Sequence, residues 1–445
     1  MASVMTAFRS RTLTSLFKVH RFPPLCFTSL IPSRNNIQTP TTTCFTKTLC
    51  TSPAHHGIGS SSDEEEIVIN KPKVEYRRNQ TNIALGITKK LLLNEAKDSN
   101  LVCAPLSIQV VLSLLNSKTN STFDDRALAS ELAARVFADG SQKGGPRVSC
   151  ANGLWVDESV HLEPSLEQAV GSAYNSALHR VDFKTEYEEV RTRVNSWVEE
   201  ETNGLIKGVL SPGSVNSLTR LLFANALYFK GDWADKFAAS LTKKYDFHLL
   251  NGNPVKAVPF MTSCRERQYI SEFDGFKVLK LLYRTGKDKR LYSMCLFLPD
   301  AKDGLPAMVE RLNSECGLRS HIPYSKQRVG EFRIPKFKFS FDFAAARVLK
   351  ELGLLGGLTE EVKSRVGEPL YIPSIYQKAV IEVNEEGTEA AAVTFGVEMS
   401  AASPCPPKPK VIDFVADHPF MFVIREEVTE TVLFIGYVLN PLLKG

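Results

Sequence analysis

Side chains that could support hydrolysis are present in this sequence, but they lack the spacing that an active site requires. Eight histidines and many serines are scattered over 445 residues, yet no G-x-S-x-G turn occurs to expose a nucleophilic serine. No His-rich or Asp-Glu group has metal-ligand spacing, and no glycine-rich phosphate loop follows a predicted strand. His418 precedes Pro419 within an apolar run, which is typical of a core histidine. The sequence therefore predicts neither an enzyme nor a cofactor.

The most distinctive chemistry lies near the end of the chain, in residues 379–410. Residues 379–383 alternate apolar and polar side chains as a half-buried strand does. The triplet 385–387 (Glu-Glu-Gly) should then release the chain into an exposed segment. Residues 388–393 carry almost only small side chains and 394–403 are short of charge, so the segment could stay in solvent or enter the middle of a sheet. The alternative is an alanine-rich helix start, because Ala has the highest helix propensity.

The charge of the chain is concentrated at its beginning. Net charge is +5, but residues 1–62 carry six Lys or Arg and no Asp or Glu, so the rest of the chain is nearly neutral. The charge of the chain after residue 62 therefore does not indicate a nucleic-acid-binding protein. Hydrophobic content of 43% and charged content of 23% are ordinary for a globular protein, and no run approaches the ~20 apolar residues of a membrane span. We therefore expect neither nucleic-acid nor membrane partners.

Residues 1–62 have the composition of an organelle transit peptide, being basic, rich in Ser and Thr, and free of acids. Plastid and mitochondrion are not distinguished, and the alternatives are a disordered extension or a mis-assigned start of translation. Residues 63–71 form an acidic linker that should be solvated. The nine cysteines are odd in number and include no C-x-x-C pair, which favours thiols in a reducing compartment.

The elements that must position the 379–410 segment follow from periodicity. Residues 82–94 have apolar side chains at helical spacing, and 103–108 open a second helix with Pro105 in its tolerated first turn. Residues 221–233 are apolar and aromatic, as in a central strand buried on both faces. Residues 334–339 alternate as a strand. Helices and strands of this kind predict an α+β protein.

Several ordered blocks carry a resemblance to a known family. They are Cys103–Ile108 (C-A-P-L-S-I), Val194–Trp197, Thr202–Ile206, Leu221–Trp233 (L-L-F-A-N-A-L-Y-F-K-G-D-W), Ile334–Phe339 (I-P-K-F-K-F), Asn384–Ala392 (N-E-E-G-T-E-A-A-A), Asp413–Phe420 and Thr431–Pro441. Together they resemble the serpins, the serine-protease-inhibitor family. The residues of these motifs are most similar to those of plant members. The resemblance covers residues 72–445 and implies the serpin fold, with three β-sheets, eight to nine helices and an exposed reactive-centre loop over about 385–410.

The resemblance implies a suicide substrate. A target protease would cleave the loop at Ala401-Ala402, with Ala402-Ser403 as the second choice, and the freed loop would insert into the main sheet and trap the protease covalently. The hinge of this movement would be Glu385, Glu386, Gly387, Thr388, Glu389, Ala390, Ala391 and Ala392. A small bait residue suggests elastase-like or subtilisin-like serine proteases, with papain-like cysteine proteases as a second class. The resemblance implies a monomer, and other serpins occur in the cytosol or extracellular space.

This sequence departs from the family pattern at positions that bear on insertion. The region where the sheet would open includes Ser107, Asn225, Trp233 and Gln377. Gln377 stands where serpins usually have a His, and Ala104 replaces a Ser. Residues 116–135 are shorter than two helices require, and Glu398 would face inward after insertion. These departures favour the alternative, a non-inhibitory serpin that acts as a binding or storage protein.

Overall fold

The computed structural model describes eight stretches of the chain. They are residues 71–94, 99–115, 123–162, 164–173, 177–314, 317–355, 374–386 and 410–444. The leader, most of the acidic linker and residues 387–409 lie outside them. The expectations for the transit peptide and for the bait bond therefore fall on residues that the structure does not describe.

The described residues contain seven α-helices, three short 3-10 helices and fifteen strands. The α-helices are α1 (Lys71–Asn94), α2 (Pro105–Leu115), α3 (Phe123–Val136), α4 (Pro164–Ala173), α5 (Phe183–Glu201), α6 (Leu305–Ser314) and α7 (Ala345–Glu351). The 3-10 helices are η1 (Ser141–Lys143), η2 (Ala239–Leu241) and η3 (Arg319–His321). None of these helices combines the length and apolar character needed to cross a bilayer. Helix α1 begins at Lys71, before the predicted start at residue 82. The prediction missed the first residues of the helix because they lack the apolar spacing on which it depended.

The strands fall into two hydrogen-bonded sheets. They are β1 (Leu101–Cys103), β2 (Arg147–Asp157), β3 (Ala177–Val181), β4 (Leu221–Lys230), β5 (Lys243–His248), β6 (Pro254–Met261), β7 (Arg267–Phe273), β8 (Phe276–Leu282), β9 (Tyr292–Pro299), β10 (Lys326–Pro335), β11 (Phe337–Ala344), β12 (Ser374–Val383), β13 (Val411–Val415), β14 (Phe420–Glu426) and β15 (Val432–Val438). The mixed architecture confirms the predicted α+β class.

The expected number of sheets is corrected by strand β10. Its first residues pair with β7, from Lys326 to Arg328, whereas its last residues pair with β6 at Ile334 and Pro335. One strand thus joins two of the three expected sheets into a single ten-stranded one, with β13 beside β10. The predicted strand over 334–339 is likewise two strands, because β10 ends at Pro335 and β11 begins at Phe337.

The five-stranded sheet has the order β11-β12-β4-β2-β3. Its two central strands, β12 and β4, are parallel, with a register that runs from Ser374↔Leu222 to Ile381↔Phe229. The pairs on either side, β11 with β12 and β2 with β4, are antiparallel. Every β4 residue except Lys230 is buried, which confirms the prediction of a central strand.

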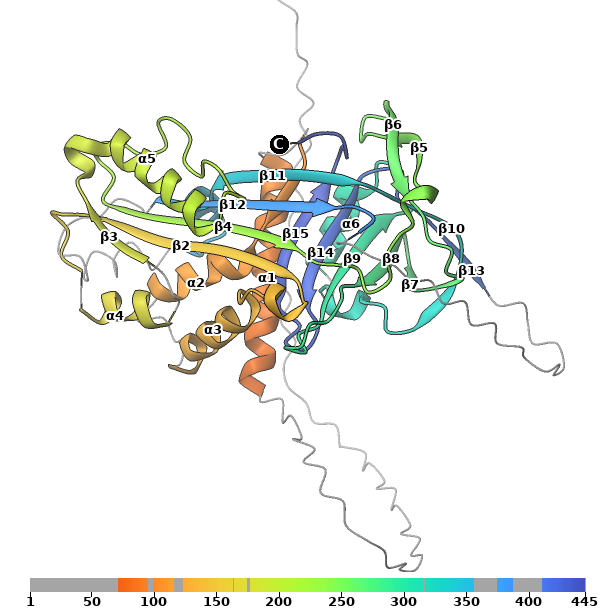
Figure 1. The fold of residues 1–445 in the computed structure, drawn as a ribbon, viewed down its shortest axis with the longest axis horizontal. Coiled ribbons are helices and arrows are strands. Elements are labelled where there is room, and N and C mark those ends of the chain that lie inside the picture. Colours follow the sequence, from red (N-terminus) through yellow and green to blue (C-terminus); the bar gives the residue numbers. More distant parts are fainter. Residues whose placement is uncertain are drawn as a thin grey trace, which may run out of the picture. The chain divides into compact units, whose positions relative to one another are not determined.

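Helices cover both faces of the five-stranded sheet (Figure 1). On one face, α5 packs three valines against β2 and β4, and on the other face α2 lies beneath the same strands. The buried residues of β12 alternate along the whole strand, as predicted for residues 379–383. Between α2 and β2 the described residues contain one α-helix, α3, in the region that is shorter than two helices require. The sheet is therefore held between helices, and its central parallel pair lies well inside the fold.

Candidate functional site

A row of amide side chains crosses the centre of the five-stranded sheet. Gln377 of β12 lies opposite Asn225 of β4, and Asn225 lies opposite Asn152 of β2. Gln377 Nε2 donates to Asn225 Oδ1 at 3.0 Å, and Asn225 Nδ2 donates to Asn152 Oδ1 at 2.5 Å. Three adjacent strands are thus joined by side chains as well as by their backbone ladders. This amide row lies across the β4–β12 boundary.

Gln377 also connects the row to the start of α2. Its Oε1 accepts from Ala104 N at 2.8 Å, and its Nε2 donates to Ala104 O at 2.9 Å. Gln377 is only 1% exposed, so these bonds are made away from water. The Ser107 hydroxyl is buried and, within the part of the chain that the structure describes, has no partner. Of the residues predicted for the opening region, Gln377 and Asn225 are therefore brought together and Ser107 is not bonded to them.

Sequence reasoning missed Asn152, whose only signal is an amide between Ala151 and Gly153 in the middle of strand β2. The nearby Cys150 Sγ lies 4.0 Å from Asn225 Nδ2. Burial raises the pKa of the Cys150 thiol to about 12, despite hydrogen bonds from Asn152 and Asn225 that lower it. The thiol is therefore neutral, and the amide row carries no charge.

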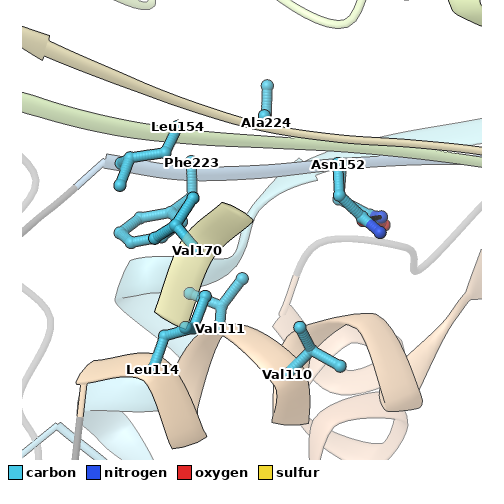
Figure 2. Close-up of a pocket in the computed structure, with 10 residues that line it drawn as sticks. Val110, Val111, Leu114, Asn152, Leu154, Val170, Phe223 and Ala224 are labelled. Carbon is cyan, nitrogen blue, oxygen red and sulfur yellow. Dashed lines mark hydrogen bonds between the residues drawn. The ribbon is translucent and has the colours of Figure 1, made fainter. Parts of the chain in front are cut away.

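The helix side of the amide row is apolar. Figure 2 shows Asn152, Leu154 and Phe223 directed toward the helices, whereas Ala224 points to the opposite side of the sheet. Val110, Val111 and Leu114 of α2 and Val170 of α4 complete the lining of a narrow hollow there. Any separation of β4 from β12 must therefore break the amide bonds, while α2 contributes only apolar contacts on this side.

A second group of bonds anchors the chain where it leaves β12. Trp233 Nε1 donates to Asn384 O at 2.8 Å, and Phe237 N donates to Glu385 O at 3.1 Å. Trp233 is 3% exposed and stacks on Tyr283, with ring centres 4.5 Å apart. Trp233 of the predicted opening region thus acts at the end of β12 and not within the amide row.

Glu385 is the strongest part of this anchor. Its Oε2 lies 2.6 Å from Lys336 Nζ, and its Oε1 accepts from Thr242 Oγ1 at 2.7 Å. Burial raises the pKa of the Glu385 carboxyl, but the bonds from Lys336 and Thr242 outweigh burial and hold it below its ordinary value. The expectation that Glu385 begins an exposed segment is wrong, because this residue is 7% exposed; Glu386 is the first exposed one. Lys336 lies between the end of β10 at Pro335 and the start of β11 at Phe337, so it belongs to neither strand.

The remaining predicted residues lie outside the described ranges. These are Gly387, Thr388, Glu389, Ala390, Ala391, Ala392, Glu398, Ala401, Ala402 and Ser403. The chain is described again from Lys410 and enters β13, where Val411 pairs with Arg328. In the described stretches no group of His, Cys, Asp or Glu could hold a metal ion. His418 Nε2 donates to Pro299 O at 2.7 Å, and His418 is buried as the core residue that the sequence predicted.

These features define an α+β protein in which a long connection starts beside a parallel strand pair at the centre of a sheet. The chain belongs to the serpin family: the family model for serpins (serine protease inhibitors) matches residues 78–441. The family consists typically of protease inhibitors and not of enzymes, in agreement with the lack of an active-site motif. The resemblance drawn from the sequence blocks is therefore confirmed.

Plant serpins are among its most similar relatives. Serpin-ZX of Arabidopsis thaliana is 46% identical over 385 residues, which cover 82% of this chain and 97% of the relative. Serpin-ZXA of Oryza sativa subsp. japonica is 46% identical over 366 residues, covering 77% of this chain and 91% of the relative.

Solved serpin structures share the fold. Arabidopsis AtSerpin1 in its native stressed conformation has a TM-score of 0.77 and 44% identity, with 83% of this chain and 99% of that chain covered. Uncleaved ovalbumin, at 21% identity and a TM-score of 0.66 over 82% of this chain and 100% of that one, shares the fold alone.

Proposed function

We propose that this protein inhibits serine proteases as a suicide substrate, with its bait bond at Ala401-Ala402. The observation that carries the proposal is the parallel pairing of β12 with β4. A chain that leaves the end of β12 and folds back between these strands runs antiparallel to both. One parallel ladder is then replaced by two antiparallel ladders, and parallel pairing is the less stable of the two per residue. An inserted strand between β12 and β4 would therefore be hydrogen-bonded on both of its edges.

The sequence after Glu386 suits such an insertion. Gly387 can act as the pivot, Thr388 is the first uncharged residue to enter, and Ala390, Ala391 and Ala392 present no bulk. Trapping requires energy, because slowing deacylation about 10⁶-fold corresponds to roughly 8 kcal/mol. The proposal assigns this energy to strand pairing that is withheld in the uncut protein, which makes its stability kinetic.

The anchor and the amide row supply the restraint that such a state needs. Lys336 and Thr242 hold Glu385, and Gln377 with Asn225 closes the β4–β12 boundary. These bonds are made by separate side chains, so a loop that enters the sheet would break them one after another. The position of Gln377, where serpins usually have a His, therefore does not by itself weaken the proposal.

The proposed targets have shallow specificity pockets, because the bait side chain is small. We include elastase-like and subtilisin-like serine proteases, with papain-like cysteine proteases as a second class. An acyl-enzyme forms at the bait residue when the protease nucleophile attacks its carbonyl carbon and the bond to Ala402 breaks. Insertion of the freed loop then drags the protease away and distorts its active site, which slows hydrolysis of the acyl-enzyme.

The test is incubation of the full chain with subtilisin or elastase, followed by a denaturing gel. We expect a protease–serpin band that survives detergent. The matched variant is Thr388→Arg, which leaves the bait bond intact but puts a charge on the first residue to be buried, and it should be cut without trapping. Clean cleavage of the unaltered chain would instead support the alternative, a binding or storage serpin. Glu398 favours this alternative, because its carboxylate would face inward after insertion.

We also propose that residues 1–62 direct import into a plastid or mitochondrion, because they are basic and hydroxylated and have no acidic residue. A fluorescent protein fused after residue 71 should enter one of these organelles in plant cells. The same fusion without residues 1–62 is the control and should remain outside them. A full-length fusion that is distributed like this control would contradict the proposal.

A further inference from the structure

Strands β7 and β8 separate after the pair Tyr269↔Lys280. Before Tyr269, β7 pairs with β10, whereas after Lys280, β8 continues beside β9. The separation leaves a small, partly open hollow of about 20 Å³. It is lined by Trp233, Asp235, Phe237, Ser263, Gln268, Tyr269, Lys280, Leu281, Leu282 and Lys326. The hollow therefore has apolar walls and several polar side chains.

Lys280 is a buried cation with weak compensation. Its side chain is 8% exposed, and Glu427 Oε2, its ion-pair partner, is 3.7 Å away, beyond hydrogen-bond range. The Glu427 carboxylate also serves Arg425 Nε at 3.4 Å and accepts from Ser293 Oγ at 2.5 Å. The Lys280 ammonium lies over the rings of Tyr269 and Tyr324, 5.0 and 5.5 Å from their centres. One carboxylate is thus shared by two buried cations.

Positive charge remains in excess when the neighbouring groups are included. Arg425 also approaches Glu430, but Glu430 is shared with Arg319. Lys326, an exposed residue of β10, adds a further ammonium 5.1 Å from the centre of the Tyr269 ring, and no ion pair joins it to a carboxylate in the described part of the chain. Cation–π contacts offset only part of the energy that burial of an unpaired charge requires.

The other charged group at the hollow does not supply the missing negative charge. Asp235 also lines the hollow, and its carboxylate is paired with Arg265. Gln268 is 8% exposed, and in the described residues its side chain makes one long hydrogen bond, 3.4 Å from Nε2 to Ser263 Oγ. The hollow therefore offers two ammonium groups, an amide and a hydroxyl that can all donate to an anion.

We propose that this hollow binds a small oxyanion, held by Lys280 and Lys326 with Gln268 and Ser263 as further donors. The ligand class is a phosphate or sulfate group, or the carboxylate of a small organic acid, because such oxygens form charge-assisted hydrogen bonds with ammonium groups. Lys280 is the central residue of the site, since it is buried and the anion would complete its charge compensation.

The oxyanion site adjoins the anchor at the end of β12. Trp233 and Phe237 line the hollow and also hold Asn384 O and Glu385 O. A bound ligand that fixes these two residues would hold the anchor closed and slow loop insertion. This consequence rests on the proposed function, whereas binding itself does not.

The test is calorimetric titration and thermal unfolding of the full chain with inorganic phosphate, against sodium chloride at the same ionic strength. We expect a saturable rise in the transition temperature. Lys280→Met should bind phosphate at least about tenfold more weakly, because a charge-assisted bond is lost. Lys277→Met is the matched control, since this lysine is on the same strand but donates to Asp413 O at the surface. Sulfate and succinate distinguish a bare oxyanion from a carboxylate ligand.

Two outcomes would overturn the site. The first is an equal phosphate response in the unaltered chain and in Lys280→Met. The second is a clear loss of stability of Lys280→Met in chloride, since that would mean that Glu427 and the two tyrosine rings already compensate the charge. The coupling is tested by the rate at which the covalent complex with subtilisin forms, which phosphate should lower in the unaltered chain only. An unchanged rate overturns the coupling, and a complete lack of complex counts against the proposed function while the titration still decides the site.

Discussion

The side-chain amide of Gln377 pairs with the backbone of Ala104 in both directions. Ala104 N donates to Gln377 Oε1 at 2.8 Å, and Gln377 Nε2 donates to Ala104 O at 2.9 Å. This is the arrangement that two peptide groups adopt in a sheet ladder, made here between β12 and the residue before α2. A third bond to Asn225 extends it to β4. Because Gln cannot titrate, this connection is independent of pH.

Gln377→Ala should lower the stability of the native state by about 2–4 kcal/mol, because it leaves a buried N–H and C=O of Ala104 unpaired and opens a small cavity. The measurement is the transition temperature at a fixed scan rate, since the stability of the uncut state is proposed to be kinetic. Gln327→Ala is the control, because the side chain of this exposed glutamine on β10 bonds only Ser325 within the described residues. Equal shifts in the two variants would mean that the amide row does not restrain the sheet.

Glu385 should make the native state sensitive to acid. The pKa of its carboxyl is lowered in the folded protein: burial raises it, but the bonds from Lys336 and Thr242 prevail. A lowered pKa means that the ionised form is favoured by folding. The contribution is complete above the ordinary value of 4.5 and is lost as the pH falls through the lower folded value. Glu385→Gln should therefore flatten the acid part of the stability profile, measured between pH 3 and 7 by urea unfolding.

A double-mutant cycle with Lys336→Met should give a coupling of about 1–2 kcal/mol for the pair Lys336–Glu385. The matched control is Lys338–Glu382, an ion pair of 2.7 Å between β11 and β12 in which the lysine is 66% exposed. Its coupling should stay below about 0.5–1 kcal/mol, because solvent screens it. A coupling at Lys336–Glu385 no larger than this control would remove Glu385 from the restraint.

The sequence predicted the family and two strands of the five-stranded sheet, β4 and β12, because a strand's pattern of apolar side chains is local. It could not predict that Gln377 bonds Ala104, since the two residues are far apart in the chain and meet only after both sheets form. The burial of Glu385 was missed for the same reason: its partners come from β10–β11 and from η2. Asn152 carried too weak a signal, because a single amide among the mixed side chains of β2 has no periodicity.

Ala401→Arg should redirect the proposed inhibition from subtilisin or elastase toward trypsin, because a long basic bait side chain requires a deep acidic specificity pocket. The measurement is the rate of complex formation with each protease. The expected change in the preference ratio is at least about 10³-fold, corresponding to about 4 kcal/mol of differential transition-state binding. Ser403→Arg is the control, since residue 403 does not enter that pocket if Ala401 is the bait. A switch produced by Ala402→Arg and not by Ala401→Arg would move the bait bond to Ala402-Ser403.

Glu398 provides the last and most demanding prediction. With strand period 2, an inserted loop that starts inward at Thr388 also places residue 398 inward, whereas Glu389 faces outward. Burying an unpaired carboxylate costs several kcal/mol, which opposes about 8 kcal/mol needed for trapping. Loop cleavage by subtilisin should raise the transition temperature of the unaltered chain by at least about 10 °C if the loop inserts.

Glu398→Ala should raise the transition temperature of the cleaved form further and increase the fraction of protease trapped, while Glu389→Ala leaves both unchanged. The uncut forms of all three proteins should unfold alike, since the carboxylate is buried only after insertion. If cleavage leaves the transition temperature of every form where it was, no strand has entered between β12 and β4. If Glu389→Ala has the larger effect, the inserted register is shifted by one residue, and the inward face must be reassigned.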